Sequence, residues 1–302
     1  MTRVANVQGR WLREVSMVAV IRIQRNALIF AILFFLATAV VAQDTTAPGP
    51  QGGPETGDAG LQKDVQNPVA SLTLVPFQNN TNFDSGPFNR TQNVLDIQPV
   101  IPVNISSYWK VIVRIVQPVT WQPYPNQNTG GEYGFGDMAP DFFFSPRHPG
   151  KLMWGIGPAF AIPTATNNVL GQGKFSIGPS AVVLVQPGKW TIVNLVNNVW
   201  SVAGSGSRPP VNQMLDQYFI TRNLKNGWYV TSAPIITANW NASRGNVWTV
   251  PFGGGVGRVQ KLGNQPVNWK VEFFGDAVHP RGGSPWSMRL TLALLYPKHS
   301  KK

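Results

Sequence analysis

The sequence contains no cysteine and few charged residues. Without cysteine, no disulfide bond, thiolate metal site or thiol nucleophile can form, so the fold must be held together in another way. Charged residues make up 13% of the chain, about half of the usual share of roughly 25%. What it has instead is 11 Trp, 16 Phe and 6 Tyr, together with 30 Gly and 26 Pro. This composition indicates short apolar segments separated by turns.

Groups for catalysis are also scarce. Of the three histidines, His299 is in the C-terminal tail, and His148 and His279 fall in a predicted turn and a predicted loop. No HExxH spacing and no serine, histidine and acid in a recognisable context occur. The glycines at 253–257 are followed by neither a Lys-Ser/Thr pair nor a helical pattern, so they do not form a phosphate loop. We therefore expect no enzyme, no cofactor and no metal site.

The net charge of +12 and the pI near 10.2 raise the question of a nucleic-acid partner. Much of the excess lies at the two ends of the chain, at Arg3, Arg10, Arg13, Arg22, Arg25, Lys298, Lys301 and Lys302. The remaining basic residues are isolated and alternate with apolar ones, without the stripe that binds a phosphate backbone. The distribution argues against nucleic-acid binding.

An uncharged run of sixteen residues, ALIFAILFFLATAVVA, extends from Ala27 to Ala42. Basic residues precede it and a polar stretch follows, which is the three-part form of a secretory signal. Because a membrane-spanning helix needs about 20 apolar residues, the run is short for an anchor. We expect residues 1–42 to be a signal peptide that is cleaved before Gln43. Met17 offers a second start that gives the same mature protein.

Residues 43–70 are rich in proline, glycine and polar side chains and predict a disordered periplasmic linker. From residue 71 onwards the pattern changes to segments of about ten residues whose apolar side chains alternate with others. Leu95, Ile97, Ile101 and Val103 alternate in this way, and so do the apolar residues of 109–115. We predict strands at 71–77, 95–103, 109–115, 132–145, 152–162, 175–185, 190–202, 213–223, 228–238, 247–261, 266–277 and 286–296. The barrel so predicted covers 71–297, and 298–302 form a basic tail.

The connections between these segments alternate between short and long. Tight turns are expected at 104–107, 146–150, 187–189, 224–227 and 263–265, and longer loops at 121–131, 164–173, 203–212, 239–246 and 278–285. Outer-membrane barrels have short periplasmic turns, longer external loops and even strand numbers. The sequence therefore predicts an all-β, up-and-down antiparallel transmembrane β-barrel of about 12 strands.

Aromatic residues lie mostly at the ends of the predicted strands, where a membrane barrel places its interfacial girdles. The predicted girdle consists of Trp109, Trp190, Trp200, Trp228, Trp269, Trp286 and Tyr296. Charged residues of opposite parity to the apolar face are expected to line the lumen, because a lipid-facing Arg or Lys at mid-depth costs roughly 2 to 4 kcal/mol. These are Lys110, Arg114, Lys174, Arg222, Lys270, Arg289, Asp96, Asp216 and Glu272. Their excess of positive charge favours anions if the lumen is open, whereas paired charges would plug it.

Four stretches carry a resemblance to a known family: NPVASLTLVPFQNNTNFD (67–84), QNVLDIQPVIPVN (92–104), PIITANWNA (234–242) and WTVPFGGGVGRV (248–259). They resemble a poorly characterised family of bacterial outer-membrane proteins labelled putative transporters and sometimes neuromedin U. The resemblance covers about 67–297. It implies an outer-membrane β-barrel similar in shape to barrels linked to the uptake of phenol and other aromatic compounds. No agreed substrate and no catalytic residue come with it.

These observations predict an outer-membrane channel or transporter for passive passage of small solutes, either anion-preferring or suited to small aromatic and hydrophobic compounds. The expected partners are outer-membrane lipid, the solute and the barrel assembly machinery, whose terminal signal the strand 286–296 resembles although PKHSKK follows it. One alternative is a non-conducting structural or adhesion barrel in the same membrane. Another is a secreted soluble all-β binding protein.

Overall fold

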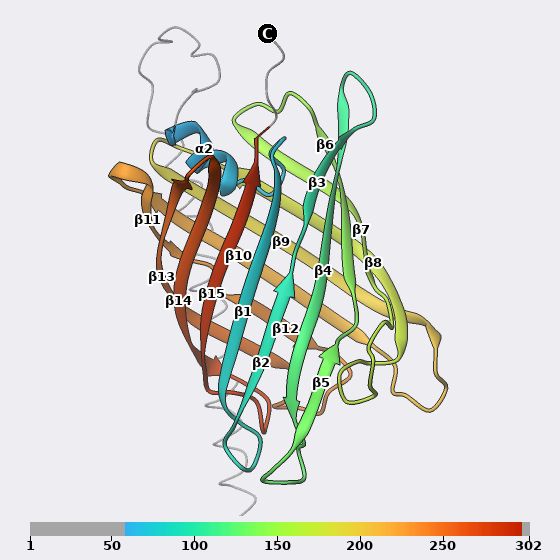
Figure 1. Ribbon diagram of the computed structural model, residues 1–302. Helices are drawn as coiled ribbons and strands as arrows, with labels where there is room; N and C mark the ends of the chain where they lie inside the picture. Colours follow the sequence, from blue (N-terminus) through green and yellow to red (C-terminus); the bar gives the residue numbers. More distant parts are fainter. Residues whose placement is uncertain (1–57, 298–302) are drawn as a thin grey trace, which may run out of the picture. The chain divides into compact units, whose positions relative to one another are not determined.

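The computed structural model describes residues 58–297, which form a barrel of β-strands with one short helix at one end (Figure 1). The strands are β1 (Thr73–Ser85), β2 (Arg90–Ile97), β3 (Val100–Asn104), β4 (Trp109–Pro123), β5 (Gly131–Phe135), β6 (Ala139–Pro146), β7 (Leu152–Ala161), β8 (Lys174–Val185), β9 (Trp190–Gly204), β10 (Asn212–Asn223), β11 (Trp228–Ser232), β12 (Ile235–Asn239), β13 (Trp248–Leu262), β14 (Gln265–Val278) and β15 (Trp286–Tyr296). The helix is α2 (Asp58–Val65), and a single 3-10 turn, η2 (Lys225–Gly227), precedes β11.

All strands belong to one antiparallel sheet that closes on itself. Each strand pairs with at least one strand next to it in the chain, and β1 pairs with β15 over the register from Thr73↔Tyr296 to Phe83↔Trp286. Three strand positions in the wall are each divided in two, as β2 with β3, β5 with β6, and β11 with β12. The wall therefore has twelve strand positions. The predicted all-β, up-and-down barrel of 12 strands is confirmed.

Four of the prolines inside the strand pattern lie where the hydrogen-bond ladder is interrupted. Pro99 separates β2 from β3, and Pro234 separates β11 from β12. Pro158 and Pro179 face each other across β7 and β8, and the pairing of β8 with β9 skips residues 178 and 179. Because proline has no N–H to donate, these positions lose little that the ladder would otherwise have.

The connections distinguish the two ends of the barrel. Tight turns at 105–108, 147–151, 186–189, 224–227 and 263–264 mark one end, which we call the short-turn end. The opposite, long-loop end carries the connections 86–89, 124–130, 162–173, 205–211, 240–247 and 279–285. The predicted alternation holds except at 86–89, which is short because β1 extends to Ser85 and not only to residue 77.

Alternate side chains of each strand face outwards and inwards, and the two faces differ in chemistry. The outer face exposes large apolar side chains such as Ile156 (55% exposed) and Phe273 (54%). On the inner face, Ile112 and Glu272 are each 0% exposed. Side chains directly opposite each other in paired strands lie on the same face, so the register assigns every strand residue to one of them.

The expected disorder of residues 43–70 is wrong for the part that the structure describes. Residues 58–65 form α2, and the chain from Gln66 to Leu72 is packed within the barrel end before it enters β1. Residues 43–57, the predicted signal peptide 1–42 and the predicted tail 298–302 lie outside the described residues. Within 58–297, no helix is long and apolar enough to cross a membrane.

Candidate channel interior

An interior space of about 720 Å³ runs from the long-loop end towards the middle of the barrel. Its wall comes from both sides of the barrel, with Gln78 and Asp96 on one side and Asn197 and Gln213 on the other. Loop residues of 242–247 and 280–281 surround its outer end. The lining mixes amide, carboxylate and guanidinium groups with small apolar side chains, so it suits water and small polar solutes.

A constriction separates this space from a smaller cavity of about 160 Å³ nearer the short-turn end. Four side chains line both cavities and therefore surround the constriction: Gln78, Gln98, Arg114 and Gln217. Three of them are neutral amides, which leaves Arg114 as the charged member of the ring. Arg114 therefore lies at the boundary between the two cavities.

Arg114 is held in place by two interactions. Its guanidinium forms an ion pair of 2.8 Å with Asp141 and donates a hydrogen bond of 3.2 Å to the side-chain oxygen of Gln98. Asp141, whose side chain is 4% exposed, also accepts a longer bond of 3.4 Å from Asn197. Charge-assisted bonds of this kind fix a long side chain in one position.

A second ionic cluster lies on the inner face of β14 and β15. Glu272 lies 2.7 Å from the ammonium of Lys270 and 3.8 Å from the guanidinium of Arg289. Arg289 also donates to the carbonyl oxygen of Ala233 at 2.7 Å and to the side chain of Asn80 at 2.9 Å. The amide of Asn80 in turn donates to Asp96 at 2.9 Å. These bonds cross-link five strand positions from within the barrel, namely β14, β15, β1, β2 and the position shared by β11 and β12.

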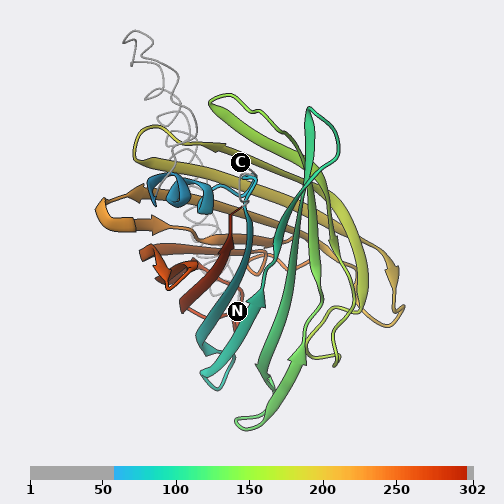
Figure 2. The same cartoon turned by 45° about the horizontal axis from the view of Figure 1, so that its top comes forward.

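The short-turn end is filled by the segment 58–72, which we call the N-terminal plug. Figure 2, with this end turned forward, shows α2 within the ring of strand ends. The plug's hydrogen bonds reach around the wall, with donor and acceptor as follows: Gln62 to the carbonyl of Trp228 (2.9 Å), Gln66 to the side chain of Asn223 (2.7 Å), Gln186 to the carbonyl of Lys63 (2.9 Å) and Asn67 to the sulfur of Met153 (3.2 Å). The wall from β7 to β11 therefore holds the plug in one orientation.

Apolar side chains of the plug enter two clusters on the inner wall. Val69, 2% exposed, packs among Ile112, Phe143, Leu184 and Leu195 of the wall. Ala70 and Leu72 join the second cluster, whose wall members are Leu74, Tyr229, Val259, Ala293 and Leu295. Burial of a side chain of this size contributes about 1.5 to 3 kcal/mol. The plug is thus part of the core, and it closes the smaller cavity, which Val65, Gln66, Asn67 and Pro68 line.

Lys110 lies beside the plug on the inner face of β4. It is 3% exposed, and its ammonium donates to the hydroxyl of Ser71 at 3.3 Å. Partial loss of water around Asp64 raises the pKa of this carboxyl above its ordinary 3.8, and the positive charge of Lys110 acts in the opposite direction. The docked plug therefore places a carboxylate and an ammonium near each other at this end.

The structure places seven of the nine predicted lumen residues on the inner face: Lys110, Arg114, Lys174, Lys270, Arg289, Asp96 and Glu272. Asp216 and Arg222 lie on the outer face, which corrects their predicted position. Asp216 stands opposite Val196, whose face continues through Ala181 to the exposed Ile156. Arg222 stands opposite Trp190 and lies 5.5 Å above its ring.

The prediction failed on β10 because the inner face of this strand carries large apolar side chains among its polar ones. Leu215 and Phe219 point inwards and pack against the cluster around Val69. The usual contrast between an apolar outside and a polar inside is therefore lost where the wall meets the plug. On the outside, Asp216 accepts a hydrogen bond of 2.6 Å from Asn194, while Arg222 lies near the short-turn end, where a cation can reach water.

Two interior residues that matter for the charge arrangement were not predicted, Asp141 and Asn80. Asp141 precedes the run Phe142-Phe143-Phe144, in which Phe143 faces inwards at 1% exposure and Phe144 faces outwards at 43%. Three consecutive aromatic residues hide the alternation. Asn80 belongs to the part of β1 beyond residue 77, which the predicted strand did not include.

All seven residues of the predicted girdle lie on the outer face. Trp109, Trp190, Trp228, Trp269 and Tyr296 lie towards the short-turn end, and Trp200 and Trp286 towards the long-loop end. Trp228 and Trp269 contact each other edge to face at 5.4 Å between centroids. Trp286 stacks on Phe83 at 3.9 Å and donates its indole N–H to Asp84 at 2.9 Å.

Comparisons with protein-family models and with curated protein sequences give no match. Among solved structures, the chain is similar to the COG4313 outer membrane channel from Pseudomonas putida F1, with a TM-score of 0.59 and 13% identity over 75% of this chain and 96% of that one. It also matches outer membrane phospholipase A from Escherichia coli with a TM-score of 0.43 and 9% identity, over 74% of this chain and 90% of the other. The first likeness shows that the barrel has the fold of an outer-membrane channel.

This likeness supports the architectural part of the family resemblance. The specific label, as a putative transporter or neuromedin U, stays a prediction. Since proteins of one fold carry out different functions, the arguments for function come from the interior of the barrel.

Proposed function

We propose that this chain is a passive channel of the Gram-negative outer membrane for small polar solutes, with a mild preference for anions. The observation that carries the proposal is the interior space of about 720 Å³, which is lined by polar side chains and leads to a constriction at Arg114. On the inner wall, the five predicted cations Lys110, Arg114, Lys174, Lys270 and Arg289 outnumber Asp96, Asp141 and Glu272. Cation-rich walls favour anions.

In this proposal the short-turn end faces the periplasm, as the short turns of bacterial barrels do. The N-terminal plug fills that end, so the conformation described is closed. Solutes pass only when the plug moves away from the wall. The partners are then outer-membrane lipid around the wall, the solute, and the assembly machinery that receives the terminal strand β15.

The two alternatives fit the observations less well. A soluble secreted protein would not present large apolar side chains around its whole outer face, since soluble monomers avoid extended apolar patches. A non-conducting scaffold accounts for the paired interior charges and the plug, but gives no role to a polar space that extends from the long-loop end to the constriction.

Single-channel recording of the purified mature protein in planar bilayers tests the proposal. We expect discrete current steps separated by closed periods, and a reversal potential in a KCl gradient that indicates anion preference. The variant Arg114→Gln removes the cation at the constriction and lowers the positive excess of the inner wall by one charge, while the new amide can still donate a hydrogen bond to Asp141. It should move the reversal potential towards zero. The double variant Arg114→Gln with Asp141→Asn removes a cation and an anion together, leaves the net charge of the wall unchanged, and should shift the reversal potential much less.

Arg222→Gln is the matched control, since it removes a guanidinium from the outer face. Its reversal potential should equal that of the wild-type protein. Complete absence of current steps, both from the full mature protein and from a variant without residues 58–69, would count against a channel and in favour of a scaffold.

A further inference from the structure

On the outer wall near the short-turn end, two arginine side chains each lie over a tryptophan ring of the neighbouring strand. Arg222 of β10 stands directly opposite Trp190 of β9, and its guanidinium carbon lies 5.5 Å from the centroid of that ring. Arg258 of β13 repeats this arrangement with Trp228 of β11, at 5.3 Å. Contact with the face of a ring attracts a cation and holds it in place. We call these the two Arg–Trp pairs.

The guanidinium groups of both pairs are open to a ligand. Arg222 is exposed, and Arg258 uses its Nε to donate a hydrogen bond of 3.2 Å to the carbonyl oxygen of Asn226. Within residues 58–297, neither arginine forms an ion pair with a carboxylate, and the terminal nitrogens of both have no hydrogen-bond partner. Each pair therefore presents an ordered cation whose donors are still available.

The part of the wall around the two Arg–Trp pairs carries positive charge alone. Residues 186–193, 217–232 and 254–269 contain no Asp or Glu. Besides the two arginines, they contain Lys189, Lys225 and Lys261. The turns that carry Lys189 and Lys225 are adjacent, because the N–H of Asn223 donates to the carbonyl oxygen of Lys189 at 2.7 Å. Such a local excess of one charge favours an anionic ligand.

Exposed apolar side chains continue from each pair towards the middle of the wall. On β10, the outward residue next to Arg222 is Ile220, which is 43% exposed. On β11 and β13, the next outward residues are Val230 and Val256, which stand opposite each other and are also exposed. An anion bound at the pairs thus lies beside a surface that suits hydrocarbon chains. This is the arrangement that a phospholipid needs, with its headgroup at the rim and its chains along the wall.

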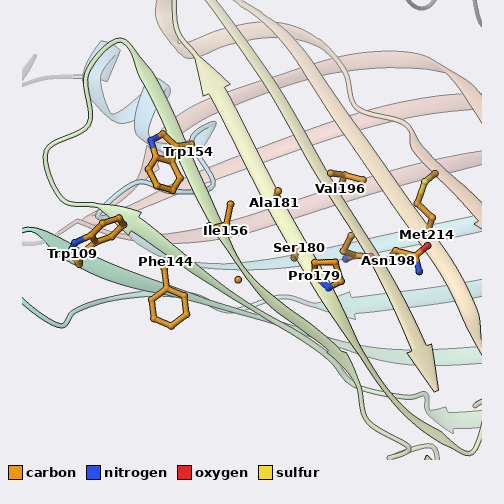
Figure 3. Close-up of a pocket in the computed structure, with 12 residues that line it drawn as sticks. Trp109, Phe144, Trp154, Ile156, Pro179, Ser180, Ala181, Val196, Asn198 and Met214 are labelled. Carbon is orange, nitrogen blue, oxygen red and sulfur yellow. The ribbon is translucent and has the colours of Figure 1, made fainter. Parts of the chain in front are cut away.

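Another part of the outer wall has tryptophans at the same end without these cations. Trp109 of β4 and Trp154 of β7 meet edge to face at 6.0 Å between centroids, and they border an outer groove whose lining contains no charged side chain (Figure 3). Among the described residues, no guanidinium lies over either ring. A tryptophan at this end therefore does not require an arginine, and the Arg–Trp pairs distinguish the wall from β9 to β13.

We propose that the two Arg–Trp pairs bind the phosphate groups of anionic phospholipids in the leaflet at the short-turn end. Each guanidinium donates hydrogen bonds to phosphate oxygens, which its planar fork fits, and each tryptophan lies at the level of the headgroup. A zwitterionic headgroup fits less well, because its own cation is repelled by Lys189 and Lys225. The inference rests on the proposed function only in placing the outer face in a membrane.

Native mass spectrometry of the purified mature protein in detergent micelles tests this inference. The probes are dioleoyl phosphatidylglycerol and dioleoyl phosphatidylcholine in equal amounts, which share their acyl chains and differ in net charge. We expect two molecules of phosphatidylglycerol per barrel to bind about fivefold more tightly than phosphatidylcholine, the factor that one cation near a membrane surface contributes. The double variant Arg222→Gln with Arg258→Gln should remove most of this preference.

Arg147→Gln with Lys151→Gln is the matched control, because it removes two cations from the turn 147–151 at the same end of the barrel. Its preference for phosphatidylglycerol should equal that of the wild-type protein, and a heat-modifiability gel shows that each variant is folded. Equal binding of the two lipids to the wild-type protein, or an equal loss of preference in the two double variants, would overturn the inference. Displacement of the lipid by an excess of sodium phosphate would do so too, since it identifies a free phosphate as the ligand.

The outcome is independent of conduction, because lipid binding is measured as mass and not as current. A barrel that selects phosphatidylglycerol but never conducts keeps this inference and loses the proposed channel. A barrel that conducts but binds the two lipids equally has the opposite result.

Discussion

A covalent tie between residues 66 and 223 should silence the channel, and cutting the tie should restore the current. Gln66 lies in the N-terminal plug and donates a hydrogen bond of 2.7 Å to Asn223 at the end of β10. With this contact made permanent, the plug cannot leave the inner wall, and the smaller cavity stays closed. The effect should be complete, because the plug fills the only route along the axis at this end that the described residues form.

The absence of cysteine makes the experiment direct. In the double variant Gln66→Cys with Asn223→Cys, the two introduced thiols are the only ones, and a short bifunctional maleimide with a cleavable disulfide in its spacer joins them. The same protein is recorded in planar bilayers before cross-linking, after it, and after reduction. Open probability should fall to zero in the second recording and return in the third.

The control joins two wall strands without tying the plug. Thr221 and Thr231 stand opposite each other in β10 and β11, with their hydroxyls 2.8 Å apart. Cross-linking of Thr221→Cys with Thr231→Cys should leave the current steps as they are. If the protein tied at 66 and 223 conducts as well as the reduced one, the plug does not gate the channel.

Glu272→Gln should lower the stability of the barrel strongly, whereas Asp216→Asn should not. Glu272 is fully buried between Lys270 and Arg289, and its loss leaves two interior cations without their carboxylate. Removal of one member of a buried ionic group costs about 3 to 5 kcal/mol. The temperature at which the folded band disappears in a heat-modifiability gel, together with the loss of β-sheet circular dichroism, should fall accordingly.

Asp216→Asn removes the same charge from the outer face, where no ion pair within the described residues involves Asp216. The amide oxygen can still accept the hydrogen bond from Asn194, and a lipid-facing wall gains from the loss of a charge. The unfolding temperature should stay the same or rise. Equal losses in the two variants would mean that the inner ionic cluster does not hold β14 and β15 together.

The sequence predicted the wall well because a β-barrel repeats a local rule. Each strand alternates between two environments and each turn has its own residues, so positions such as 152–162 and 286–296 agree with β7 and β15 to within a residue. The length of β1 was missed, since Asn79, Asn80 and Asn82 extend the strand with polar side chains that donate hydrogen bonds to side chains of β2.

The plug and the faces of β10 were not predictable by the same rule. The helix α2 has only 8 residues and a weak apolar face, and isolated helices shorter than about 12 residues are marginal in water. Its structure depends on wall residues far away in the sequence, such as Trp228 and Gln186. Leu215 and Phe219 likewise face inwards, because they pack against the buried cluster that contains Val69. Both errors come from contacts between distant segments.

Closure of the wall between β1 and β15 has a consequence for the way the protein folds. Thr73 must meet Tyr296 before the last pair of strands can form, so nearly the whole chain has to be present before the sheet loses its edges. Contacts between residues so distant in sequence form slowly, and strands with free edges associate with other chains in the meantime. The yield of folded protein therefore depends on the pairing of the first strand with the last. A chaperone that keeps the free edges of β1 and β15 away from other copies of the chain should affect this yield more than the stability of the finished barrel does.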